Sequence, residues 1–85
     1  GIHAHNLRDF TTKIEKVDVI SIEFHAKRGD FEAWFKGLGD EELTKKIALL
    51  KKSGLSGESL RKQLHYVVEQ RYVELGKIAG IQTYI

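Results

Sequence analysis

The sequence predicts an all-α protein, a compact bundle of four or five helices that ends in a long C-terminal helix. Apolar residues recur three and four positions apart in most segments, which is the period of an amphipathic helix. The chain has eight glycines and no proline, so glycine must end the helices and connect them. We expect one helical domain over residues 1–80, followed by a C-terminal tail over residues 81–85.

The first expected helix covers residues 4–17. Its apolar positions follow the helical period, and charged residues occupy the opposite face. One side of this helix should therefore pack on the rest of the domain, through Ala4, Leu7, Phe10, Ile14 and Val17.

Residues 17–25 fit two structures. From Ile20 onward, apolar and polar residues alternate as in a half-buried strand. Alternatively, Asp18 caps a helix that ends at Gly29. We favour the helix because Gly29 followed by Asp30 is typical of a joint between two helices, while a strand stays open as the alternative.

The stretch between two Gly-Asp steps, at positions 29–30 and 39–40, holds three aromatic residues. Phe31, Trp34, Phe35 and Leu38 lie at i, i+3, i+4 and i+7, which predicts one apolar face on a short helix. Such a short helix is not stable alone, so we expect Trp34 and its neighbours to form the centre of the core. The glycines should adopt positive φ, and the aspartates should cap the helices that follow.

Two helices are expected in the second half, at residues 40–53 and roughly 57–79. The apolar stripe of the longer one continues for five turns, beyond what the shorter helices can cover. A second copy or the remainder of a longer parent chain should cover the excess, unless the tail folds back over it. The candidate interface residues are Tyr72, Leu75, Ile78 and Tyr84.

Four short patterns occur in a fixed order along the chain: Ala4-x-x-Leu7, Ser21-Ile22-x-x-His25, Arg28-x-Asp30-Phe31-x-x-Trp34 and Gly39-Asp40-x-x-Leu43. In this order they resemble a small domain family of unknown function that is seen mainly in archaea and in some bacteria. The resemblance extends over residues 1 to about 75 and is strongest over residues 21–43. It implies a compact, mostly helical domain and implies no activity.

One cluster of polar and aromatic residues is a candidate site for a small ligand or an anion. His25, Arg28, Asp30 and Trp34 are close in sequence, and a histidine, a cation and a carboxylate beside an aromatic ring can hold an anion. The structural alternative is that Asp30 caps a helix, Arg28 pairs with a carboxylate and His25 lies at the edge of the core.

DNA binding is a second alternative. Residues 43–64 resemble a helix-turn-helix, with a glycine in the turn and a basic second helix. The net charge of +2 and the apolar continuation of the second helix weigh against it. The residues that would contact phosphates are Lys51, Lys52, Arg61 and Lys62.

The amino-acid composition excludes several classes of function. Cysteine is absent, which removes disulfides, thiol catalysis and thiolate metal sites, and neither a serine nucleophile motif nor a phosphate-binding glycine loop is present. We therefore predict that the protein is not an enzyme and binds neither a metal nor a cofactor. No apolar run is long enough to span a membrane, so a cytoplasmic protein is expected. Few Asn, no Cys and abundant Lys and Glu resemble a heat-adapted, thermophilic composition.

The function that the sequence favours is a non-enzymatic helical interaction or regulatory module. Its partner would be a protein, either a second copy in a homodimer or the remainder of a larger chain. The larger chain is expected because methionine is missing from position 1. Nucleic acid is the less favoured partner and a membrane is not expected.

Overall fold

The structure, a computed structural model, describes residue 4 and residues 6–83, with side chains as far as residue 76. Over these residues it forms five α-helices and no strand, which confirms the predicted all-α class. The helices are α1 (Leu7–Ile14), α2 (Val19–Arg28), α3 (Asp30–Gly37), α4 (Glu41–Lys52) and α5 (Gly57–Thr83).

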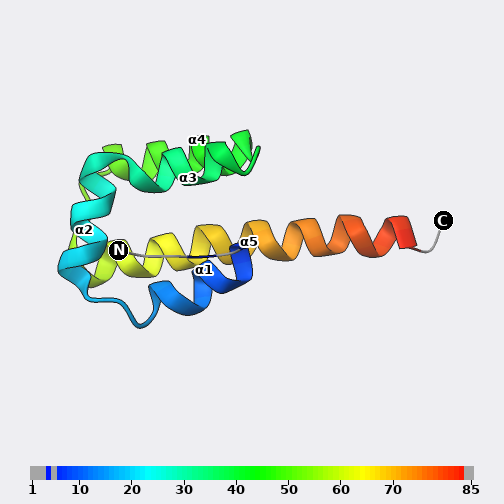
Figure 1. Cartoon of the computed structure of the whole chain (residues 1–85), viewed down its shortest axis with the longest axis horizontal. Helices are drawn as coiled ribbons and strands as arrows, with labels where there is room; N and C mark the ends of the chain where they lie inside the picture. The colour runs from blue at the N-terminus through cyan, green and yellow to red at the C-terminus, as the bar shows by residue number, and fades with distance from the viewer. Residues whose placement is uncertain (1–3, 5, 84–85) are drawn as a thin grey trace.

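Helix α5 is the axis around which the other helices are arranged (Figure 1). Helices α1 and α4 lie along its first half on different sides, α3 packs beside α4, and α2 crosses the N-terminal end of α5. The C-terminal part of α5 continues past all four of them. The fold is thus a compact bundle from which one helix projects.

Within residues 17–25 the chain is helical from Val19 onward, as we favoured, because both ends of α2 are capped. The Asp18 Oδ1 atom accepts a hydrogen bond from the Ile20 amide at 3.0 Å, and Gly29 ends the helix in the left-handed conformation at φ 75°. An N-cap carboxylate and a left-handed glycine satisfy backbone groups that a helix end leaves unpaired. These local bonds decide against the strand.

The two Gly-Asp steps differ from each other. Gly29 and Gly39 both have positive φ, 75° and 83°, as predicted. Asp40 caps α4, accepting a hydrogen bond from the Leu43 amide at 3.0 Å. Asp30 does not cap α3, so that prediction was wrong: Gly29 ends α2 and also precedes α3 directly, which leaves Asp30 as the first helical residue.

The core is centred on Phe10 and Phe35, which corrects the prediction that Trp34 is its centre. Three rings of α3 surround Phe10, with centroids 5.6 Å away for Phe31, 5.6 Å for Trp34 and 5.2 Å for Phe35. Phe35 is fully buried, whereas Trp34 is partly buried and stacks on the outside of Phe10. The remaining buried residues are Ile14, Ile22, Phe31, Leu43, Ile47, Leu60, Leu64 and Val68.

Leu7 and Leu38 also differ from expectation. Leu7 is only partly buried against the core, and Leu38 is half exposed, because α3 ends at Gly37 and Leu38 lies just beyond it. Helix α5 runs to Thr83, so residues 81–83 of the expected tail are helical rather than folded back.

Candidate interaction surface

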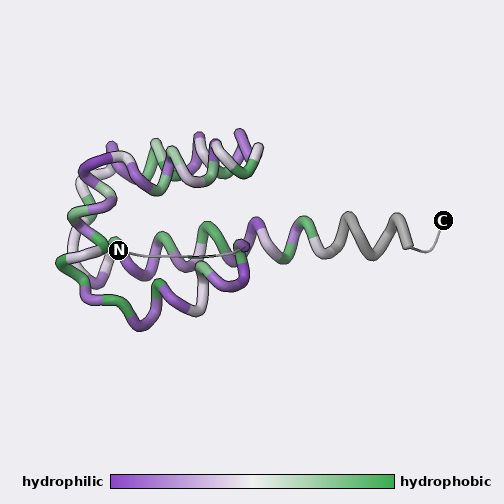
Figure 2. Tube along the Cα trace, viewed as in Figure 1, coloured by the Kyte–Doolittle hydropathy of each residue, from purple (hydrophilic) through white to green (hydrophobic). Residues whose placement is uncertain are grey.

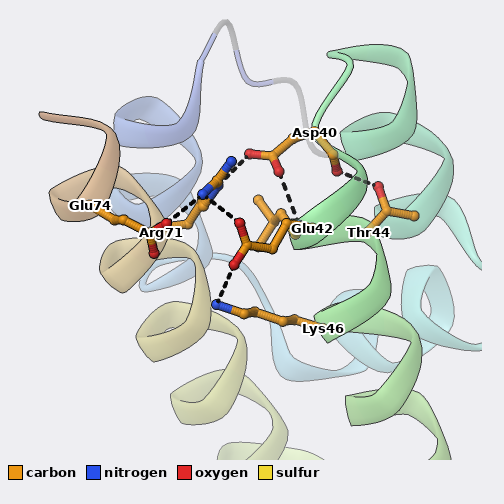
Figure 3. Close-up of polar contacts among 7 residues, drawn as sticks. Asp40, Glu42, Thr44, Lys46, Arg71 and Glu74 are labelled. Carbon is orange, nitrogen blue, oxygen red and sulfur yellow. Dashed lines mark hydrogen bonds and ion pairs between the residues drawn. The ribbon is translucent and has the colours of Figure 1, made fainter. Parts of the chain in front are cut away.

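The point where α5 leaves the bundle is occupied by a cluster of ion pairs around Arg71 (Figure 3). The Arg71 Nε atom donates to Asp40 Oδ2 at 2.9 Å, and its Nη1 atom donates to Glu42 Oε2 and Glu74 Oε1 at 2.8 Å each. The Arg71 side chain is 14% exposed and that of Asp40 is 10% exposed. One guanidinium therefore joins α5 to the first turn of α4 in a largely buried setting.

Asp40 has two roles in this cluster. One carboxylate oxygen caps α4, and the other accepts from Arg71. Burial by itself would raise the pKa of Asp40, but the hydrogen bonds from Arg71 and the Leu43 amide outweigh it, so this pKa is lowered from its ordinary value. In turn, the hydrogen bond to Asp40 raises the pKa of Arg71. The Asp40 carboxylate and the Arg71 guanidinium therefore each stabilise the charged form of the other.

Arg71 also marks a change of environment along one face of α5. Leu64 and Val68 are buried on that face, and Arg71 follows Val68 by three residues. Beyond it on this face, exposure rises to 40% at Tyr72 and 37% at Leu75. Hydrophobic residues continue along the helix past this point (Figure 2). The apolar stripe is thus covered up to Arg71 and exposed after it.

The described part of the predicted interface lies on this exposed portion, which we call the outer half of α5, residues 72–83. The Arg8 guanidinium of α1 lies 6.0 Å from the centroid of the Tyr72 ring. Leu75 is exposed three residues further on. The side chain of Ile78 and the whole of Tyr84 lie outside the described residues.

The predicted ligand cluster is brought together only in part. The Asp30 Oδ2 atom lies 2.7 Å from His25 Nδ1 and 3.6 Å from Arg28 Nε, while the Arg28 guanidinium lies over the Phe24 ring at 5.1 Å. The ring contacts of Trp34 are instead with Phe10 and Phe35. This geometry ties the end of α2 to the start of α3, and a ligand there stays a prediction.

The predicted DNA-contacting residues are also divided. The Arg61 Nη1 atom donates to the backbone oxygens of Ile14 and Glu15 at 3.0 and 2.9 Å, so this side chain holds the end of α1 against α5. Lys51, Lys52 and Lys62 are exposed. Helices α4 and α5 pack side by side as a hairpin (Figure 1), whereas a helix-turn-helix crosses its two helices steeply. DNA binding therefore gains no support from this arrangement.

The structure also bears on metal binding and on membrane insertion. Among the residues that the structure describes, no group of three His, Asp or Glu side chains could hold a metal ion. No helix in the same part of the chain is both long enough and apolar enough to cross a membrane.

Sequence reasoning missed Arg71 and its carboxylate partners. A signal was present: positions 64, 68, 71 and 75 follow the 4-3-4 spacing of a buried helix face, and an arginine occupies the third of them. A charged residue at such a position requires a buried partner. Asp40, expected only as a cap, supplies it.

Comparisons with known proteins identify a family but no activity. A family model matches residues 1–69, and it is described as a family of unknown function (DUF5752). This confirms the resemblance to a domain family of unknown function, while its archaeal distribution stays a prediction. No curated protein and no solved structure matches the chain.

Proposed function

The chain belongs to DUF5752, a family of unknown function, and we propose that this domain is a helical protein-interaction module that acts through the outer half of α5. The observation that supports it is the exposed apolar stripe after Arg71. The first partner we propose is a second copy of the chain, because a patch that can bury itself against its own copy needs no further protein.

The lengths of the helices explain why this surface is left uncovered. At 1.5 Å per residue, the 27 residues of α5 are about 40 Å long, whereas the 12 residues of α4 cover about 18 Å and the eight of α1 about 12 Å. These lengths leave most of the outer half beyond both neighbours, although Arg8 of α1 still lies beside Tyr72 at its start. Because α5 stays helical to Thr83, residues 81–83 do not fold back over it either.

The total exposed area is larger than that of a compact protein of the same mass. The whole chain exposes 5837 Å², whereas a compact monomer of 9.7 kDa exposes about 5100 Å². The excess of roughly 700 Å² belongs to the whole chain, and the projecting part of α5 contributes to it (Figure 1). It is of the same order as the ~800 Å² that each partner buries in a typical specific interface.

The partner's surface should be mainly apolar. Tyr72, Val73 and Leu75 are all exposed, and of the two charged residues in the outer half, Glu74 and Lys77, Glu74 is already paired with Arg71. Other exposed apolar side chains lie on α2 and α4, namely Ile20, Phe24 and Leu49, and they provide the comparison for the outer half.

Sedimentation velocity of the whole chain, from low to high micromolar concentration, tests the proposal. We expect the wild type to dimerise and Leu75→Glu to remain monomeric with unchanged helicity by circular dichroism. Leu49→Glu is the matched control, because Leu49 is 67% exposed on α4 and lies outside the outer half. A wild type that stays monomeric at 100 micromolar, or a Leu75→Glu variant that dimerises normally, would refute self-association.

A further inference from the structure

We infer that two copies pair through the outer halves of α5 in an antiparallel, two-fold arrangement, with the two bundles at opposite ends of the helix pair. This inference rests on the proposed function, since it specifies how the proposed dimer is built. It follows from where the bundle lies relative to the exposed face of α5.

The apolar face that is covered in the inner half of α5, up to Arg71, continues on the same side of the helix in the outer half, where it is exposed. Leu75 follows Val68 by seven residues, which is about two turns, so both residues lie on nearly the same line along α5. Val68 is fully buried against the bundle, while Leu75 is exposed beyond it. A partner that covers Leu75 must therefore approach from the side of α5 that the bundle occupies further back.

A parallel pair is blocked on this side. Parallel α5 helices would place both bundles at the same level, each in the space between the two helices. The axes of packed helices are only 8–10 Å apart. The chain measures 23 Å and 21 Å across its two shorter axes, so two bundles cannot share that space.

An antiparallel pair avoids the collision. The outer half, residues 72–83, is about 18 Å long, and reversing the second copy places its bundle beyond the far end of this segment. Each helix end then approaches the end of the other bundle. Leu38 is half exposed there, two residues before Asp40, and can be covered by the incoming helix. Opposed helix dipoles also favour antiparallel packing slightly.

The arrangement predicts how distances change along the helix. In an antiparallel pair, moving a probe by one residue away from the two-fold axis adds 3 Å to the separation of the two probes, twice the rise of about 1.5 Å per residue. In a parallel pair this separation stays constant. The chain contains no cysteine, so single cysteines can be introduced and labelled without removing any native one.

Spin labels at Lys62→Cys and Gln70→Cys provide the test by pulsed dipolar spectroscopy on the intact dimer. Both positions are exposed, and neither belongs to the outer half. The eight residues between them predict that the Lys62 pair is about 24 Å further apart than the Gln70 pair. This difference does not depend on where the axis lies.

Two outcomes overturn the inference in distinguishable ways. A dimer of confirmed mass with equal distances at the two positions contradicts the antiparallel arrangement and leaves the interaction module standing. A chain without an intermolecular dipolar signal, and with monomer mass at the same concentration, contradicts the inference together with self-association. A distance difference near 24 Å that disappears in Leu75→Glu supports both.

Discussion

Helix α5 contains two halves that share one apolar period and lie in opposite environments. In the inner half, up to Arg71, Leu60, Leu64 and Val68 are buried. In the outer half, Tyr72 and Leu75 continue the same apolar period in an exposed setting. The difference is set by the neighbours, because α4 begins where Arg71 meets Asp40 and the start of α1 lies beside Tyr72. Helical periodicity thus predicts which face is apolar, while burial depends on the lengths of other helices.

The family match divides the chain at nearly the same place. It covers residues 1–69, which include α1 to α4 and most of the inner half, and stops two residues before Arg71. What the family model describes is therefore the bundle, and the outer half extends beyond it.

The largest expected contrast is between Leu64→Ala and Leu75→Ala. Leu64 is buried, so its truncation should lower the free energy of unfolding by about 2–5 kcal/mol. Leu75 lacks this packing in the monomer, and its truncation should change that free energy by less than about 0.5 kcal/mol. Urea denaturation at low micromolar concentration measures both. Equal losses would mean that the outer half is packed in the monomer.

Arg71→Gln tests the boundary between the halves. It removes the cation that the nearly buried Asp40 carboxylate requires, and should cost about 2–3 kcal/mol in denaturant titrations. Lys62→Gln removes an exposed cation from the same helix and should cost less than about 0.5 kcal/mol. A loss as small as that of the control would show that the cluster does not hold α5 to α4.

Acidification should weaken the same boundary. The pKa of Asp40 is lowered below its ordinary value of 3.8, so its contribution to stability is present above pH 3.8 and is lost as the pH falls through the lowered value. Asn is also a good N-cap, so Asp40→Asn keeps the cap and removes the charge, at about 1–2 kcal/mol near neutral pH. Its stability should fall less than that of the wild type between about pH 4 and pH 2. Identical pH profiles would contradict this role.

Alanine substitutions at two glycines should give the smallest effects, one destabilising and one stabilising. Gly39 has φ 83°, so Gly39→Ala should destabilise the bundle by about 1 kcal/mol. Gly76 lies inside helix α5 with open space around the Cβ position, so Gly76→Ala should raise helical content and add up to about 1 kcal/mol to the local stability of the helix. Thermal unfolding followed by circular dichroism measures both, and a stabilising Gly39→Ala would contradict the left-handed joint.

Much of the fold could be predicted because local chemistry determines it. Glycines at positive φ, the Asp18 and Asp40 caps and the apolar periods depend on near neighbours in sequence. The errors concern tertiary contacts. The Asp30 carboxylate contacts His25 instead of capping α3, and Trp34 stacks on Phe10 of another helix while the smaller Phe35 occupies the centre.

The candidate surface was predictable only in outline. The sequence indicated that α5 is longer than its neighbours, and Tyr72 and Leu75 followed from its stripe. The place where burial stops depends on the contact between Arg71 and Asp40, 31 residues apart, which no local pattern predicts.

Hydrogen exchange along α5 at two protein concentrations tests the central claim most directly, because it compares the two halves in one experiment. We predict slow exchange of the inner-half amides, from Leu60 to Arg71, at both concentrations. The amides of residues 74–83 should exchange fast at low micromolar concentration, where the monomer predominates, and slowly at high concentration, where the dimer forms. Equal protection of both halves at every concentration, or an outer half that never becomes protected, would contradict the account.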